Sequence, residues 1–194
     1  DLEQFDDLCD QMLFNTALPT DFESSKSSFV LEPGDSDSAV METSIGQGKT
    51  LVTPFHMALI ASAIANDGVL MKPYVIDRIT DAEGEVVEQY EPAEYKTLLS
   101  ESDASVLQEY MRYVVEEGTA TKLKSDSYEA AGKTGSAEFS SSSDATHSWF
   151  VGYAHNGEEP DIAVAVIVEN SGVGSEYAVP IAKQIFDAYY TWEN

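Results

Sequence analysis

The chain has 194 residues, 43% hydrophobic and 23% charged, which is the composition of a globular domain and not of a disordered segment. Ten Lys and Arg against 35 Asp and Glu give a formal charge of −25. That field repels phosphate backbones and anionic lipids, so we expect no nucleic-acid binding, and we favour a solubilising acidic surface over an acidic cleft for a cationic ligand.

The N-terminal part is predicted to be a helix followed by an irregular segment. Apolar residues recur at helical spacing over residues 1–15. Cys9, the single cysteine, lies on this pattern, cannot form an internal disulfide and is interpreted as a core thiol. Residues 16–43 are rich in Ser, Asp, Pro and Gly, which predicts an irregular surface excursion. The following Gly46-Gln47-Gly48 lacks the rest of any phosphate-binding motif and is interpreted as a structural turn.

A buried helix and a hairpin are predicted next. Thr53 is a suitable N-cap, Pro54 suits the first turn, and the apolar run behind them ends at a glycine, Gly68. His56, on this helix, is expected to be a hydrogen-bonded residue of the core or of a cleft edge. Residues 72–79 and 86–90 flank a turn signal and therefore predict a hairpin or paired arm.

The C-terminal half is predicted to be helix, three strands, helix. Ser100 begins a capping box, and the helix behind it is expected to bury one face, made by Val106, Leu107, Tyr110, Met111, Val114 and Val115. Strand patterns cover 130–139, 148–154 and 162–168, and their short linkers, 140–144 and 155–158, favour antiparallel neighbours. A final amphipathic helix, 179–192, is expected to pack on the sheet. The fold class is therefore α+β, an antiparallel sheet flanked by helices.

The tripeptide Lys133-Thr134-Gly135 lies within the first of these strands and suits serine acyl transfer. Lys133 would place a fixed positive charge where a serine hydroxyl loses its proton and an anionic substrate terminus docks. Thr134 would hold that carboxylate, and Gly135 leaves room for a substrate backbone along the strand edge. The backbone N–H of Ser136 could then serve as an oxyanion donor. The alternative is an ordinary exposed strand with a turn-prone glycine.

No metal or cofactor is expected. The three histidines, His56, His147 and His155, form no pair with acidic residues at metal-ligand spacing. His147 begins a strand and is interpreted as a sheet-surface residue, although it could face a cleft. Of Trp149 and Phe150, adjacent on a strand, one should point into the core and the other outward.

Several motifs together resemble the class B penicillin-binding proteins, particularly the branch often called penicillin-binding protein A. These motifs are, in chain order, Ser44-Ile45-Gly46-Gln47-Gly48, Thr53-Pro54-Phe55-His56-Met57-Ala58-Leu59-Ile60, Ala65-Asn66-Asp67-Gly68, Gly118-Thr119-Ala120, Ala131-Gly132-Lys133-Thr134-Gly135 and His147-Ser148-Trp149-Phe150-Val151-Gly152-Tyr153-Ala154. The resemblance covers nearly the whole chain. It implies the penicillin-binding protein or serine β-lactamase-like fold and a D,D-transpeptidase that cross-links peptidoglycan stem peptides through a serine acyl-enzyme trapped by β-lactams.

The family's roles carry over only to Lys133 and Ser136 as catalytic groups and to Thr134 and Gly135 as substrate-binding groups. No lysine follows a serine by three positions and no asparagine follows one by two, so the S-x-x-K and S-x-N motifs have no match. Residues 1–194 are therefore expected to be the C-terminal portion of a transpeptidase domain, inactive alone.

The resemblance also implies a location on the extracytoplasmic face of the bacterial membrane, with the anchor outside this chain, and partners among cell-wall synthesis or division proteins. An apolar face left bare by the truncation would favour self-association. Two alternatives stay open, a non-catalytic sensor or scaffold module and a serine β-lactamase or D,D-carboxypeptidase. S-x-x-K and S-x-N motifs upstream of Asp1 would favour an enzyme over a binding module.

Overall fold

A computed structural model describes residues 2–32, 34–138, 146–157 and 159–192, so the predicted linker 140–144 lies outside the described residues. The elements, in chain order, are α1 (Leu2–Gln11), α2 (Asp37–Ser44), α3 (Pro54–Ala65), β1 (Val69–Met71), β2 (Arg78–Thr80), β3 (Val86–Gln89), β4 (Glu94–Thr97), α4 (Glu101–Glu116), the short 3-10 helix η1 (Thr121–Leu123), β5 (Glu129–Glu138), β6 (Thr146–His155), β7 (Ile162–Val168) and α5 (Ala178–Trp192). Among these described elements, no helix is both long enough and apolar enough to cross a bilayer.

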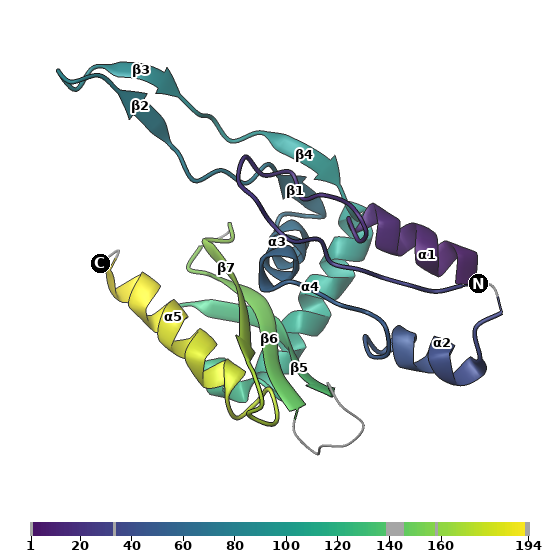
Figure 1. Cartoon of the computed structure of the whole chain (residues 1–194). Helices are drawn as coiled ribbons and strands as arrows, with labels where there is room; N and C mark the ends of the chain where they lie inside the picture. The colour runs from purple at the N-terminus through teal and green to yellow at the C-terminus, as the bar shows by residue number, and fades with distance from the viewer. Residues whose placement is uncertain (1, 33, 139–145, 158, 193–194) are drawn as a thin grey trace.

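The centre of the molecule is the antiparallel sheet β5–β6–β7, with α5 against one face and α3 and α4 against the other (Figure 1). The predicted α+β class is confirmed, and so are the three C-terminal strands and the last helix. Short connections between neighbouring strands produce this antiparallel order, as the sequence pattern predicted.

The face under α5 carries the larger core. Phe150 from β6 and Phe186 from α5 are both 0% exposed, and they pack with small and branched residues of β7, α5 and η1. Burying an aromatic side chain of this kind contributes a few kcal/mol, because its whole apolar surface leaves water. This is the outcome predicted for the Trp149-Phe150 pair, since Trp149 remains half-buried.

Phe150 also fills space that two other residues leave empty. Gly132 and Gly152 lie directly opposite each other on β5 and β6. A Cβ on Gly132 would lie 2.3 Å from Cζ of Phe150, and a Cβ on Gly152 would lie 2.7 Å from the same atom and 2.3 Å from the carbonyl oxygen of Ala131. Both positions therefore require glycine.

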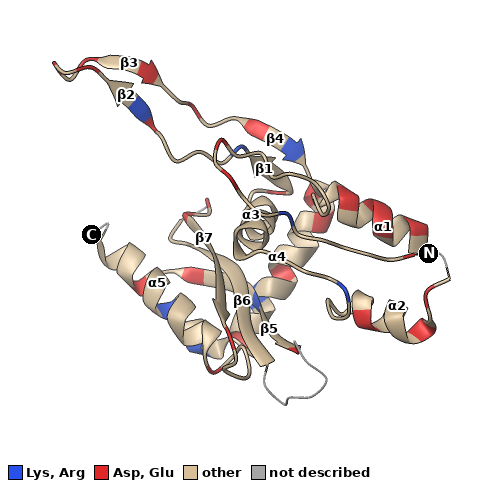
Figure 2. Ribbon diagram, viewed as in Figure 1, with Lys and Arg blue, Asp and Glu red and all other residues tan. Residues whose placement is uncertain are grey.

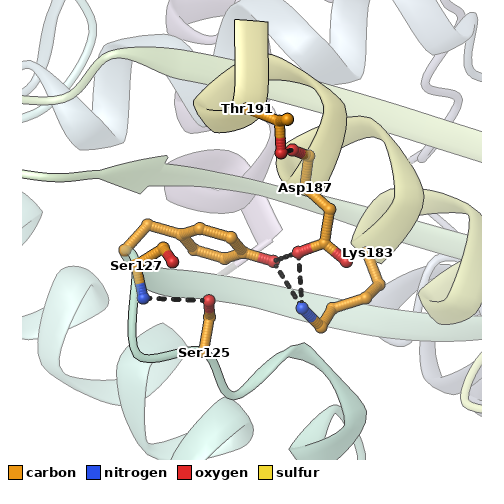
Figure 3. Close-up of polar contacts among 6 residues, drawn as sticks. Ser125, Ser127, Lys183, Asp187 and Thr191 are labelled. Atoms are coloured by element: carbon orange, nitrogen blue, oxygen red, sulfur yellow. Dashed lines mark hydrogen bonds and ion pairs between the residues drawn. The ribbon is translucent and has the colours of Figure 1, made fainter. Parts of the chain in front are cut away.

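A polar network fastens α5 to the start of β5. The hydroxyl of Tyr128 donates to Oδ1 of Asp187 over 2.9 Å and accepts from Nζ of Lys183 over 3.1 Å. Lys183 also pairs with Asp187 one helical turn further on, as Figure 3 shows. Burial raises the pKa of Asp187, but hydrogen bonds from Lys183 and Tyr128 outweigh it and hold the pKa below its usual value.

The helix α3 begins and ends as predicted. Oγ1 of Thr53 accepts from the N–H of His56 over 3.1 Å, and Pro54 occupies the first turn. Gly68 adopts φ +90° just past the helix, and a Cβ there would lie 2.3 Å from the carbonyl oxygen of Leu99. His56 is 1% exposed and its Nε2 contacts the carbonyl oxygen of Met12 at 2.7 Å, which confirms a hydrogen-bonded core histidine.

The N-terminal prediction needs two corrections. The first helix ends at Gln11, not at residue 15, because Leu13 and Asn15 adopt φ of 70° and 60° and Asn15 instead exchanges side-chain hydrogen bonds with the backbone of Phe29. The segment 16–43 is not irregular throughout, because α2 begins within it. Ser36 caps α2 by accepting from the N–H of Ala39. Serine favours loops and helix N-caps alike, so its presence alone did not separate the two.

The predicted hairpin is part of a longer arm that extends away from the sheet (Figure 1). Strands β2 and β3 pair as expected, around a turn in which Oδ1 of Asp81 accepts from two backbone N–H groups. Residues 72–77, predicted as strand, are not. At the base of the arm, β1 pairs instead with β4, a strand that the sequence pattern did not predict.

The prediction for α4 is wrong in part. Its Ser100 cap is confirmed, and Met111 and Val115 are buried. Val106 and Tyr110, assigned to the same buried face, are 47% and 63% exposed. Helical spacing identified an apolar stripe, but within the described chain only part of that stripe is covered.

Acidic residues are distributed over α1, α2, α4 and the arm, whereas Lys and Arg are sparse (Figure 2). This distribution favours a solubilising surface over a single acidic cleft.

Candidate active site

The tripeptide Lys133-Thr134-Gly135 lies in the middle of β5, which is an edge strand in the order β5–β6–β7. Lys133 and Ser136 are exposed, and Thr134 and Gly135 are half-buried. The structure therefore brings all four predicted site residues together on one accessible strand. An edge strand offers unpaired backbone groups to which an extended peptide can add.

The backbone of β5 indicates which groups face that edge. Nζ of Lys133 donates to the carbonyl oxygen of Thr134 over 2.7 Å, and we infer from this contact that the carbonyl points to the side of β5 away from β6. In an antiparallel pair, the backbone groups of alternate residues face the same way. We infer that the N–H of Ser136, two residues on, faces the same edge, as an oxyanion donor would need to do. Its catalytic role stays a prediction.

Alternate side chains of β5 are held on the α5 face. Oγ1 of Thr134 lies 2.7 Å from Oγ1 of Thr119, and Oγ of Ser136 accepts from the N–H of Gly174 over 3.2 Å. Sequence reasoning gave neither partner a role. The triplet around Thr119 was visible, but its 15-residue separation from Thr134 gives no indication that the two hydroxyls meet.

The connection from β7 to α5 is fixed to the sheet by Ser148, which is 0% exposed. Its Oγ donates to the carbonyl oxygen of Val173 over 3.1 Å and accepts from the N–H of Ala178 over 3.0 Å. Gly174 lies in this connection, so the backbone N–H that donates to Oγ of Ser136 is itself held in place. Sequence reasoning also missed this function of Ser148.

The side chain of Lys133 borders an apolar groove of about 470 Å³ on the opposite face of the sheet. Besides Lys133, the groove is lined by Met57, Ile60, Ala61 and Ile64 of α3, by Leu107, Tyr110, Met111 and Val114 of α4, and by Val151 of β6. The groove borders only one side of the Lys133 side chain, whose exposed charge stays accessible to an approaching anion or to a hydroxyl that loses its proton.

The remaining candidate groups do not gather around Lys133. Burial lowers the pKa of His56, although the hydrogen bond to the backbone of Met12 acts in the opposite direction. The lowered pKa favours the neutral imidazole in the core. Burial, with the nearby carboxylates of Asp6 and Asp10, raises the pKa of Cys9 to about 11, so this buried thiol is no nucleophile. His147 accepts from the N–H of Asn170 near the start of the central strand β6, where β7 has just ended. In the part of the chain that the structure describes, no three potential metal ligands form a group.

The fold and this lysine-bearing edge strand define a domain of the penicillin-binding kind. Residues 2–187 match the family described as the penicillin binding protein transpeptidase domain. The chain therefore belongs to the penicillin-binding protein transpeptidase family.

Two curated relatives show how the chain relates to full-length proteins. It is 31% identical over 148 residues to peptidoglycan D,D-transpeptidase PbpA of Mycolicibacterium smegmatis, covering 73% of this chain and 30% of that protein. It is 30% identical over 183 residues to penicillin-binding protein 3 of Bacillus subtilis, covering 90% of this chain and 26% of that protein. The chain thus spans between a quarter and a third of these relatives.

A solved structure of a penicillin-binding protein is also similar to this chain. The imipenem acyl-enzyme complex of penicillin-binding protein A from M. tuberculosis superposes with a TM-score of 0.81 at 28% identity, covering 94% of this chain and 40% of that one. The expected class B penicillin-binding protein fold is therefore confirmed.

Proposed function

We propose that this chain forms the Lys-Thr-Gly side of the active site of a peptidoglycan D,D-transpeptidase that also binds β-lactams. The observation that carries the proposal is the placement of Lys133, Thr134 and Gly135 on an exposed edge strand beside the groove. Relatives named as peptidoglycan D,D-transpeptidases and a neighbour solved as an acyl-enzyme support it.

Each group has a distinct part in the proposed reaction. An extended stem peptide adds to the edge of β5, and the missing side chain of Gly135 lets its backbone approach. Thr134 binds the terminal carboxylate of the peptide. Lys133 stabilises the serine oxygen as its proton leaves, and the N–H of Ser136 stabilises the negative charge that develops on the attacked carbonyl oxygen.

The nucleophilic serine is proposed to come from residues outside this sequence, because no S-x-x-K motif occurs in it. The intact protein would then act at the extracytoplasmic face of the membrane, together with proteins of cell-wall synthesis or division. We expect the 194-residue chain alone to form no covalent adduct with a labelled penicillin. Intact-mass measurement of stoichiometric labelling at one of its serines would contradict this division of the site.

The site assignment is tested in the full-length protein by the kinetics of penicillin acylation. Lys133→Ala should lower the acylation rate far more than it weakens initial binding, because the charge acts on the transition state. Thr134→Val should mainly weaken binding. Lys124→Ala removes an exposed lysine from the segment just before β5 and serves as the control. If Lys133→Ala and Thr134→Val both stay within about twofold of the wild type, the assignment is wrong.

A further inference from the structure

The turn between α4 and η1 brings a second hydroxyl to the predicted carboxylate-binding residue. Oγ1 of Thr119 lies 2.7 Å from Oγ1 of Thr134, the usual distance of a hydrogen bond between hydroxyls. Thr119 stands on a different element from Thr134, 15 residues earlier in the chain. The contact therefore depends on how the turn is packed against β5.

The residues on either side of Thr119 fix that turn. Gly118 is so close to the last turn of α4 that a Cβ on it would lie 2.8 Å from Cα of Val114. Ala120 is 0% exposed within the core under α5, and its N–H donates to the carbonyl oxygen of Val114. Because the next residue, Ala120, is buried and hydrogen-bonded to the end of α4, the Thr119 hydroxyl is kept close to Thr134 before a ligand binds.

The chemistry of two paired hydroxyls determines which of them donates the hydrogen bond once an anion is bound. A threonine hydroxyl has one proton to donate and two lone pairs with which to accept. When Thr134 gives its proton to an anion, it can accept only from its other neighbour. Thr119 is the neighbour placed to donate, and a donor on the far side strengthens the hydrogen bond that Thr134 makes to the anion.

We infer that Thr119 is a positioning residue for the anionic end of the substrate, acting through Thr134. This inference rests on the proposed function, since it assumes that Thr134 meets a carboxylate. Thr119 need not touch the substrate. It sets the direction in which Thr134 presents its proton, and its effect should therefore be felt only by ligands that carry the negative charge.

The experiment uses the full-length protein and two ligands, a penicillin and its methyl ester, which lacks the carboxylate charge. We expect Thr119→Val to lower the second-order acylation constant for the penicillin by about 3- to 10-fold, the range that one hydrogen bond supplies. The ester should change by less than twofold. Thr119→Ser keeps the hydroxyl and should restore most of the penicillin rate.

Thr121→Val is the matched control, because Thr121 lies two residues further on, is exposed, and should leave both constants unchanged. The ratio of the penicillin and ester constants is measured on the same sample, so it does not depend on how much of a variant is folded. If Thr119→Val leaves the ratio of the two constants at its wild-type value, whether both constants are unchanged or both fall equally, the inference is overturned. A Thr119→Ser variant as impaired as Thr119→Val would overturn it as well.

The two proposals fail in different ways. If the wild-type protein is not acylated by the penicillin, the proposed function is wrong. If it is acylated at a serine but the ratio of the penicillin and ester constants is unchanged in Thr119→Val, the proposed function stands and only the inference about Thr119 is wrong.

Discussion

The two faces of the β5–β6–β7 sheet differ in how completely this chain covers them. Under α5, Phe150 and Phe186 are fully buried in a continuous core. On the other face, α3 and α4 leave an apolar groove of about 470 Å³ whose rim includes Tyr110, 63% exposed. We call the face covered by α5 the closed face, and the face with the groove between α3 and α4 the open face.

The difference explains how β5 can be both rigid and accessible. Alternate residues of a strand point to opposite faces. Thr134 and Ser136 are tied down on the closed face, by Thr119 and Gly174, while Lys133 lies along the groove on the open face. The closed face thus supplies the rigidity, and the open face receives the charge that the proposed reaction uses.

The largest expected effect is a difference in the free energy of unfolding between a variant on the closed face and a variant on the open face. Phe186→Ala should lower the free energy of unfolding by about 3–5 kcal/mol, because it removes a buried aromatic ring and leaves a cavity. Tyr110→Ala should change it by less than about 0.5 kcal/mol, as exposed positions usually do. Urea denaturation followed by circular dichroism measures both. Equal losses would mean that the open face is part of the same core.

A smaller effect is expected at the edge of the closed face. Tyr128→Phe removes the hydroxyl that joins Asp187 and Lys183, and should cost about 1 kcal/mol, the usual net contribution of a hydrogen bond. Because the folded state lowers the pKa of Asp187, the carboxylate contributes stability above its unfolded pKa of about 3.9.

That contribution is lost as the pH falls through the lower, folded pKa of Asp187. The Tyr128→Phe variant has one donor fewer, so its acid destabilisation should be weaker than that of the wild type. Thermal unfolding at intervals from pH 5 to pH 2 measures the difference. Parallel curves for the two proteins would show that Tyr128 does not contribute to the low pKa.

The smallest effect on folding is expected at the groove. We predict that the chain alone self-associates through this face, because the groove is lined almost entirely by apolar side chains and burying them removes apolar surface from water. Tyr110→Ser should weaken the association seen by analytical ultracentrifugation while changing the free energy of unfolding by less than about 0.5 kcal/mol. Tyr113→Ser is the control, because Tyr113 is 61% exposed on α4 but does not line the groove. A monomeric wild-type chain would contradict the prediction.

Sequence reasoning succeeded where a local signal has one structural meaning. The Thr53-Pro54 pair and the Ser100 capping box mark helix starts because their side chains satisfy the first free N–H groups of the helix, and both were found. Where a residue type has two uses, the pattern was not enough. Ser36 was assigned to a loop and is an N-cap.

The missed features of the site are contacts between distant segments. The Lys-Thr-Gly strand could be predicted, since its residues are consecutive, but the meeting of Thr119 with Thr134 depends on how the turn after α4 packs. The open groove was missed for a similar reason. Val106 and Tyr110 have helical spacing with each other, as Leu107 and Met111 do, and spacing does not tell which part of an apolar stripe the chain itself covers.

The shared space around Phe150 has a consequence for how this sequence can change over evolution. The phenyl ring occupies the positions that side chains on Gly132 and Gly152 would need, so these three residues hold one fixed volume between them. A smaller residue at position 150 would not be enough to admit a side chain at either glycine, because a Cβ on Gly132 would also lie 2.7 Å from the carbonyl oxygen of Val151 and one on Gly152 would lie 2.3 Å from that of Ala131. In aligned descendants both positions should therefore stay glycine, even where the residue at position 150 changes.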